Sequence, residues 1–229
     1  MSTKPVIDIE KFPLLEGIDD VNKTRILANF QMRMAQKGET VLYQGTSGEN
    51  LLFLFTGRLQ VLNFLEDGKE FGLSFLDPGD YFGELSVIDN LTRSASVVAL
   101  EESSYALLPR QFAFELICKN PKIAERVLIR LASLIRKDIS LRSIASNPNA
   151  FHRVFALIDH LAKTGLGGLV VIEQLPRHHE IAIMANTTRE TVSRALRVLI
   201  NQGVIEKDLR RLIIRQPDAL RKAIEKNRS

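Results

Sequence analysis

The sequence predicts an α+β protein in which a roll of short β-strands precedes one long helix and a smaller C-terminal helical domain. Three observations lead to this fold class. Short runs rich in β-branched and aromatic residues alternate with turn residues from Met34 to Leu108. A helical pattern free of Gly and Pro then runs from Lys122 to about Ser146. Beyond it, helical periods return in a segment with a basic charge balance.

The first part of the chain is expected to form short helices followed by the roll. Residues Lys11–Arg33 carry apolar side chains at roughly helical spacing. Turn residues such as Gly57, Asp67-Gly68 and Pro78-Gly79 separate the runs that follow, a pattern typical of a β-roll of hairpins. The expected strands are Glu39–Tyr43, Leu51–Phe55, Leu59–Phe64, Glu70–Phe75, Ala95–Ala99 and Ser104–Leu108.

A short helix is expected over Phe112–Cys118, and Asn120-Pro121 begins the long helix, because Asn caps helices and Pro suits their first turn. We predict that one apolar stripe of this helix covers the roll and that the helix forms a homodimer seam with a second copy. A helix buried between two domains of one chain is the alternative. The two stripes are Ala124, Val127, Leu131, Leu134, Asp138 and Leu141, and Ile123, Leu128, Ile135 and Ile139.

The expected domains are 1–118, the long helix at 119–147 and a C-terminal domain at 148–229, with Asn147-Pro148-Asn149 as the hinge. The charge is uneven between these parts. The last domain holds 14 Lys and Arg against 8 Asp and Glu, whereas the rest holds 17 against 19. A basic domain on a mildly acidic body indicates a polyanionic partner.

The composition argues against several classes of protein. No apolar run approaches the roughly 20 residues that span a bilayer, and the N-terminus has no signal-peptide pattern, so a cytoplasmic protein without membrane contact is expected. Cys118 is the only cysteine, expected in the core, and all four histidines lie in the C-terminal third. Metal, haem and iron–sulfur sites are therefore not expected. No catalytic motif appears, which argues against an enzyme.

The C-terminal domain shows the pattern of a helix-turn-helix. Helices are expected over Ala150–Thr164, His179–Ala185 and Thr188–Gly203, with a strand at Leu169–Glu173 after a turn at Gly165–Gly168. Asn186-Thr187 separates the last two helices, where Asn tolerates the left-handed conformation, and Thr188 is a suitable N-cap.

The second helix of this motif has one apolar and one polar face. Val192, Ala195, Leu196 and Leu199 form the apolar face, and Arg189, Glu190, Ser193, Arg194 and Arg197 lie mostly away from it. In the major groove, Arg can bind guanine O6 and N7, and Glu can accept from cytosine N4. A hairpin of Val204–Glu206 and Leu212–Arg215 around Lys207–Arg211 is predicted to be a basic wing that contacts phosphates.

Glu180-Ile181 followed by Thr188-Arg189-Glu190-Thr191-Val192-Ser193-Arg194 resembles the helix-turn-helix of the bacterial cyclic-AMP receptor/fumarate–nitrate regulator family. The resemblance covers nearly the whole chain and includes Asn149–Arg153. It implies that Arg189, Glu190 and Arg194 read a palindrome of TGTGA-like half-sites in double-stranded DNA, and that His178 and His179 contact phosphates. It also implies RNA polymerase as a partner. The wing turn lacks the glycine usual in the family.

Phe82-Gly83-Glu84-Leu85-Ser86, followed by Arg93-Ser94-Ala95-Ser96, resembles the phosphate-binding cassette of cyclic-nucleotide-binding domains. Gly83 lets the backbone approach a ligand, and a short helix starting there can present free N–H groups to a phosphate. Glu84 can accept from a ribose 2′-hydroxyl, Arg93 offers a fork to the cyclic phosphate, and Ser94 adds a hydroxyl. In the alternative, the roll binds no cyclic nucleotide, and Glu84 and Arg93 pair with each other.

The long helix bears on which nucleotide is bound. In the cyclic-AMP receptor an Arg and a Thr-Ser pair of this helix approach the nucleotide, and Leu134, Asp138 and Ile139 occupy the matching positions. Asp138 either pairs with Arg142 or with an Arg of a partner helix, or it accepts from N1–H and N2–H of guanine. Cyclic AMP, cyclic GMP and cyclic di-GMP are therefore all candidate effectors of an allosteric regulator, with activity independent of a cyclic nucleotide as the alternative.

Overall fold

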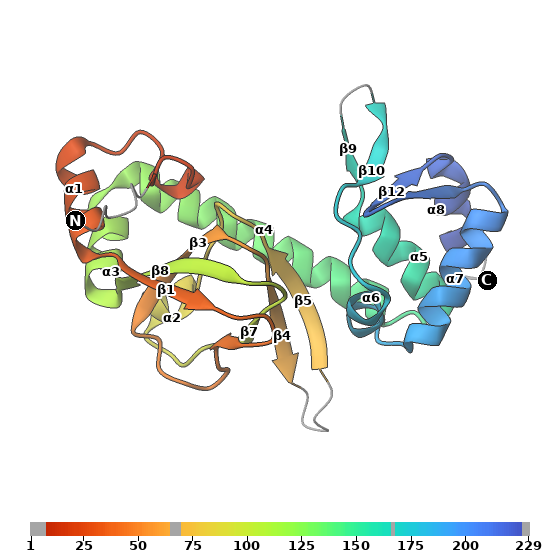
Figure 1. Cartoon of the computed structure of the whole chain (residues 1–229), viewed down its shortest axis with the longest axis horizontal. Helices are drawn as coiled ribbons and strands as arrows, with labels where there is room; N and C mark the ends of the chain where they lie inside the picture. The colour runs from red at the N-terminus through yellow and green to blue at the C-terminus, as the bar shows by residue number, and fades with distance from the viewer. Residues whose placement is uncertain (1–7, 65–69, 166–167, 226–229) are drawn as a thin grey trace. The chain divides into compact units, whose positions relative to one another are not determined.

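The computed structural model describes residues 8–64, 70–165 and 168–225 (Figure 1). The chain divides into two compact units, 1–135 and 136–229, with the boundary inside one long helix. The turn expected at Asp67-Gly68 and part of the turn expected at Gly165–Gly168 lie outside the described residues. No helix in the described ranges is both long and apolar enough to cross a bilayer.

The N-terminal unit contains two antiparallel four-stranded sheets, in the orders β1-β8-β3-β6 and β2-β7-β4-β5. The strands are β1 (Gln31–Ala35), β2 (Thr40–Leu42), β3 (Asn50–Thr56), β4 (Leu59–Phe64), β5 (Glu70–Leu76), β6 (Tyr81–Phe82), β7 (Ser96–Ala99) and β8 (Ser103–Pro109). The helical elements are η1 (Pro13–Leu15), α1 (Asp20–Asn29), α2 (Glu84–Asp89), α3 (Arg110–Lys119) and α4 (Pro121–Ala145), which continues into the second unit.

All six expected strands of this unit are present. The described residues also form β1 and β6, which the local sequence pattern does not predict. The expectation of helix up to Arg33 is wrong for its last residues, because β1 pairs with β8 from Gln31↔Leu107 to Ala35↔Ser103. β6 has only two residues, which pair with β3 as Leu52↔Phe82 and Phe53↔Tyr81. In both cases pairing with a distant strand, rather than local periodicity, decides the conformation.

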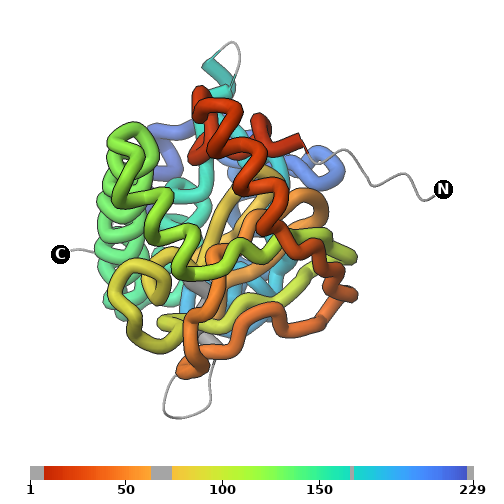
Figure 2. The backbone as a smooth tube through the Cα atoms, turned by 90° about the vertical axis from the view of Figure 1, so that its left-hand side faces the viewer, coloured from red at the N-terminus to blue at the C-terminus, as the bar shows by residue number. Residues whose placement is uncertain are grey.

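Strand β3 lies at the centre of the unit because both of its faces are buried. Phe53 and Phe55 belong to one face and lie edge-on to the Phe12 ring at centroid distances of 5.1 and 4.8 Å. Leu52 and Leu54 belong to the other face and join the cluster between the two sheets. This explains the continuous apolar run of β3. Figure 2 shows helices α1, α3 and α4 outside the strands.

Helix α4 separates its apolar residues into packed and exposed sets. Ile123 and Val127 are 1% and 3% exposed and belong to the core cluster that contains Phe12, Phe53 and Phe55. Ala124 and Leu131 are partly buried and pack against the same cluster. Leu128, Ile129, Ile135 and Ile139 are 62–65% exposed. The expected stripe of Ile123, Leu128, Ile135 and Ile139 is therefore divided, since Ile123 is in the core.

Helix α3 overturns one expectation. Cys118 was expected in the core, but it is exposed. The core contacts of α3 are made by Ala113, Leu116 and Ile117, which lie on one side of the helix. Cys118 follows Ile117 by about 100° of helical rotation, which turns it away from that side.

In its described residues, the C-terminal unit combines the end of α4 and four further helices with a four-stranded sheet in the order β11-β12-β10-β9. Its elements after α4 are α5 (Ala150–Leu161), β9 (Lys163–Thr164), β10 (Val170–Ile172), α6 (His178–Met184), α7 (Arg189–Asn201), β11 (Ile205–Asp208), β12 (Arg211–Ile214) and α8 (Pro217–Glu225). Helix α5 stops before Thr164, where we expected it to end, because Lys163 and Thr164 pair with β10. Helix α8 was not expected from the sequence.

Candidate functional site

The cassette residues lie where β6 turns into α2. Gly83 caps α2 in the left-handed conformation, with φ of +79°, and no side chain of the described residues caps the helix. A Cβ atom on Gly83 would lie 2.5 Å from Nη1 of Arg93. Glycine is therefore needed here both for the backbone conformation and for the close approach of Arg93. A Cβ on buried Gly48 would likewise collide with the side chain of Ser86.

Arg93 joins two backbone segments of the cassette. Its Nη1 donates to the Gly83 carbonyl and its Nη2 to the Asn50 carbonyl, each at 2.7 Å, and the residue is 5% exposed. Its Nε is buried and has no hydrogen-bond partner among the described residues. Glu84, 6% exposed, interacts with Arg93 electrostatically, but within the described chain the two form no direct ion pair.

Burial governs the protonation of this cluster. It raises the pKa of Glu84 above its ordinary value, although a hydrogen bond from its own N–H and the charges of Arg130 and Arg93 act in the opposite direction. Burial and the Glu84 carboxylate raise the pKa of Tyr81 to about 12, so its hydroxyl stays protonated. That hydroxyl is also buried and without a hydrogen-bond partner in the described part of the chain.

Arg130 of α4 is a residue of this cluster that sequence reasoning missed. Its Nη1 lies 3.0 Å from Oδ1 of Asp80, its Nη2 donates to the Tyr81 carbonyl at 3.3 Å, and its guanidinium lies 5.3 Å from the centroid of the Tyr81 ring. The signal in the sequence is its position one helical turn before Leu134, which matches a nucleotide-facing position of the family.

The structure brings together some of the expected ligand residues. Gly83, Glu84, Ser86 and Arg93 converge at the start of α2, whereas Leu85 is 39% exposed and Ser94 is exposed. Asp138 belongs to the second unit, where its Oδ2 lies 2.7 Å from Nε of Arg142. This is the intramolecular pair that the sequence offered as one explanation of Asp138.

These groups suit an anionic ligand that carries a hydroxyl group. The Nε of Arg93 and the hydroxyl of Tyr81 are donors without partners among the described residues, and Glu84 offers an acceptor. Buried polar groups are normally hydrogen-bonded, so each of these unpartnered donors indicates a missing polar partner.

The raised pKa of Glu84 predicts that Glu84→Gln stabilises the ligand-free protein. An acid whose pKa is higher in the folded than in the unfolded state costs stability once pH rises above its unfolded value, near 4.5. The midpoint of thermal unfolding should therefore rise by about 2–4 °C at pH 7, the shift that roughly 1 kcal/mol produces in a chain of this size. Calorimetry at pH 4 is the control, because the gain should vanish there. A lower midpoint at pH 7 would contradict the assignment.

The helix-turn-helix has the geometry that the sequence predicts. Asn186, in the turn after α6, adopts a φ of +46°, and the Thr188 hydroxyl caps α7 by accepting from the Thr191 N–H at 3.2 Å. Helix α7 buries Val192, Ala195, Leu196 and Leu199 and exposes Arg189, Glu190, Arg194 and Arg197. The polar face of α7 is therefore free to meet a partner.

The expected DNA-binding residues divide by exposure. Arg189, Glu190 and Arg194 are exposed, while Thr191 is 9% exposed and bonds internally. Its hydroxyl lies 3.0 Å from that of Thr188 and accepts from Nη2 of Arg194 at 3.4 Å. Arg194 also lies over the Phe151 ring, 6.0 Å from its centroid. Thr188 and Thr191 thus orient the first turns of α7, and Ser193 is half-buried.

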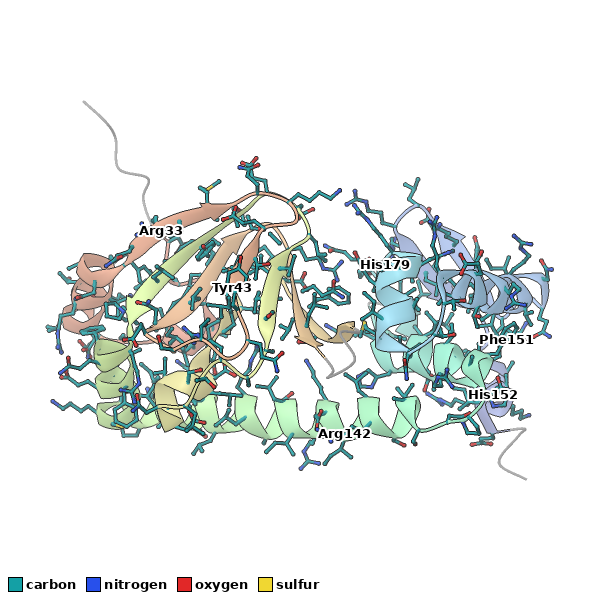
Figure 3. All side chains as sticks on the ribbon, turned by 90° about the horizontal axis from the view of Figure 1, so that it is seen from below. Arg33, Tyr43, Arg142, Phe151, His152 and His179 are labelled. Atoms are coloured by element: carbon teal, nitrogen blue, oxygen red, sulfur yellow. The ribbon has the colours of Figure 1, made fainter. Side chains whose placement is uncertain are left out.

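Positive charge gathers beside the first turn of α6. His179 is exposed (Figure 3), and His178 is half-buried. Burial lowers the pKa of His178, and the charges of Lys207 in β11 and Arg189 in α7 lower it further. The wing and the start of α7 therefore both lie within electrostatic reach of this ring, although most of the histidine stays neutral at pH 7 in the free protein.

The wing is a tighter hairpin than expected. Asp208 pairs with Arg211, so the loop consists only of Leu209 and Arg210 rather than Lys207–Arg211. Nε of Arg211 lies 2.9 Å from Oε2 of Glu173. Arg210 in the loop and Lys207 in β11 are both exposed.

Arg153 connects the hinge to the turn of the helix-turn-helix, a role that the sequence did not reveal. Its Nη1 donates to the Asn147 and Pro148 carbonyls at 2.8 and 3.2 Å. Its Nε and Nη2 donate to the Ala185 and Asn186 carbonyls, each at 2.8 Å. The local signals were an Arg in the first turn of a helix rich in apolar residues and its place at the end of Asn149–Arg153, which the family resemblance includes.

The cassette and the helix-turn-helix together define a DNA-binding transcription regulator of two domains, and comparison with known proteins identifies its family. The family described as "Cyclic nucleotide-binding domain" matches residues 32–120, and that described as "Crp-like helix-turn-helix domain" matches residues 152–223. The chain is 36% identical over 194 residues to the cyclic AMP receptor protein of Thermus thermophilus, covering 84% of this chain and 88% of that protein. The chain belongs to the CRP/FNR family of transcription regulators, which are not enzymes.

Solved structures agree with this assignment. The catabolite activator protein of Thermus thermophilus is similar with a TM-score of 0.51 and 33% identity, covering 93% of this chain and 99% of that one. The c-di-GMP responsive global regulator CLP of Xanthomonas campestris has a TM-score of 0.66 at 17% identity, with 86% and 99% coverage. The second similarity shows the fold alone.

Proposed function

We propose that the chain is a homodimeric regulator whose binding to a TGTGA-like palindrome is controlled by a cyclic nucleotide held in the N-terminal unit. The observation that carries the DNA-binding part is helix α7, packed on one face and capped by Thr188, with Arg189, Glu190 and Arg194 exposed. Arg and Glu in the first turns of a recognition helix suit the G·C pairs of such a half-site. Its DNA target places this activity in the cytoplasm, with RNA polymerase as the proposed protein partner.

The exposed apolar side chains of α4 support a homodimer. Leu128, Ala132, Ile135 and Ile139 are all exposed and are spaced four, three and four residues apart. This heptad-like spacing suits pairing with an identical helix, and the resulting two-fold axis matches a palindromic DNA site. The domains that we propose are the sensor at 1–118, the dimerisation helix at 119–147 and the DNA-binding domain at 148–229.

Cyclic AMP is the effector that we favour. The unpartnered Nε of Arg93 and the buried Glu84 suit a cyclic phosphate and a ribose hydroxyl. The pairing of Asp138 with Arg142 supports a structural role for Asp138 over guanine reading, and the 36% identical relative is named a cyclic AMP receptor protein. Guanine reading by Asp138, which would favour cyclic GMP or cyclic di-GMP, would require Asp138 to exchange Arg142 for the base.

A gel-shift titration on a TGTGA-palindrome duplex tests this function. At about 0.15 M salt, saturating cyclic AMP should increase affinity by about 5–150-fold, the usual range for allosteric coupling. The same titration with cyclic GMP, cyclic di-GMP and no ligand separates the alternatives, and a duplex with scrambled half-sites is the control. Sedimentation of the same samples should give the mass of a dimer. Equal binding to both duplexes under every condition would contradict sequence-specific regulation.

A further inference from the structure

The tip of the wing carries an unusual residue. Leu209 is the first of the two loop residues, has a φ of +50° and is 90% exposed. Glycine is favoured at such a position because an L side chain is strained in the left-handed conformation. Leu209 is also the most exposed large hydrophobic residue among those described. The position therefore combines backbone strain with a solvent-facing apolar side chain, neither of which helps the chain to fold.

The hairpin holds Leu209 in a fixed place. The Arg210 carbonyl accepts from the Leu175 N–H at 2.7 Å, next to Leu209 itself. Arg211, on the other side of the loop, pairs with Glu173 at 2.9 Å, and β12 is bonded to strands on both sides. A single substitution to glycine would relieve the strain in this turn. Strained residues that are held in place by their surroundings are common at functional sites, so the leucine indicates a function.

The surroundings of Leu209 indicate what it meets. Asp208 and Arg210 are its immediate neighbours, Lys207 precedes Asp208, and all three residues are exposed. The hydrogen bond from the Leu175 N–H to the Arg210 carbonyl places the tip of the wing beside the segment that leads into α6, and both Lys207 and Arg189 act electrostatically on the His178 ring at the start of that helix. An apolar tip with two exposed cations and one exposed carboxylate within two residues carries a net positive charge next to the helix-turn-helix, which suits a nucleic-acid groove with phosphates along its edges.

We propose that Leu209 is a minor-groove wedge that packs against a base step flanking each half-site while Lys207 and Arg210 contact the neighbouring phosphates. The proposal rests on the DNA-binding function proposed above and extends it to a contact outside the half-site. Leucine is one of the side chains that architectural proteins insert between base steps, which partially unstacks them. Flexible pyrimidine–purine steps at the flanks should therefore be preferred.

The test uses the full-length protein and a duplex that the wild type has selected from a random pool, so that it does not depend on the TGTGA sequence. With 2-aminopurine placed in turn at each flanking position, wild-type binding should raise fluorescence at one symmetric pair of steps. Leu209→Gly should abolish this rise and weaken binding by about tenfold, because a buried Leu contact is lost. Its thermal midpoint should not fall, since glycine relieves the positive φ.

Two further variants control for the substitution itself. Leu209→Asn also tolerates the left-handed backbone and should lose the fluorescence signal as Leu209→Gly does. Val21→Asn, at a 71% exposed position of α1, should behave as the wild type does. The wedge is refuted if the wild type binds without unstacking any flanking step, or if both Leu209 variants bind as tightly as it does. Failure of the wild type to select any duplex would overturn the DNA-binding proposal as well.

Discussion

Cyclic-nucleotide binding is expected to fall by at least about a hundredfold in Arg93→Met. Hydrogen bonds to a charged group contribute about 1.5–3 kcal/mol each, and the buried guanidinium is the cation placed to meet a phosphate. Arg93→Lys should recover only part of the affinity, because an ammonium cannot join the Gly83 and Asn50 carbonyls in a fork while it faces a ligand. Calorimetric titration with cyclic AMP measures both variants.

The matched control for this prediction is Arg33→Met, which removes an exposed arginine from strand β1 of the same unit (Figure 3). It should bind nucleotide as the wild type does. Circular dichroism must show that Arg93→Met is folded, because its two carbonyl partners lose their donors. A folded Arg93→Met protein that binds cyclic AMP within about threefold of the wild type would show that Arg93 is a structural residue and not a ligand contact.

Arg153→Met is expected to remove most specific DNA binding and to destabilise the C-terminal unit by about 2–4 kcal/mol. The variant keeps an aliphatic side chain but leaves four carbonyls without their donor, and two of these belong to the turn that sets the angle between α6 and α7. Nucleotide binding should stay within about twofold of the wild type, since the cassette belongs to the other unit. Denaturant unfolding and the gel-shift assay measure the two effects.

Arg215→Met is the control in the same unit. Arg215 pairs with Glu206 at 2.8 Å, and both side chains are about half exposed, so its loss should cost less than about 1 kcal/mol. If Arg153→Met were as stable as this control and bound DNA equally well, the hydrogen bonds of Arg153 between the hinge and the helix-turn-helix would contribute neither to stability nor to DNA binding. Restoration of DNA binding by Arg153→Lys would show that the positive charge alone is sufficient.

The parts of the fold that are predictable from sequence depend on local physics. The run Leu51–Phe55 is apolar on both faces because β3 is buried on both sides, and it therefore reads as a strand without knowledge of its neighbours. The left-handed turn at Asn186 and the cap at Thr188 depend on the chemistry of those residues and their own backbone. The motifs at Glu84 and at Arg189 are visible in the sequence because their chemistry lies within a few consecutive residues.

Other features escape sequence reasoning because they depend on distant partners. Strand β1 has no clear alternation and forms because β8 offers it a complete ladder. Cys118 is exposed because Ala113, Leu116 and Ile117 make the core contacts of α3 and Cys118 points away from that side. Arg130 and Arg153 look like ordinary solvated cations, and only the folded chain supplies the carbonyl groups that they bind.

The sequence by itself determined the succession of β-roll, long helix and helix-turn-helix, and which residue types stand at the cassette and on the recognition helix. Hydrophobic periodicity and helix capping depend on residues within one or two helical turns of each other, so the local sequence determines them. The tertiary structure alone decided that Arg93 bonds to Gly83 and Asn50 rather than to Glu84, and that Leu209 is held strained and exposed at the tip of the wing. Both outcomes depend on which backbone groups long-range folding brings within about 3 Å, and no local pattern encodes that distance.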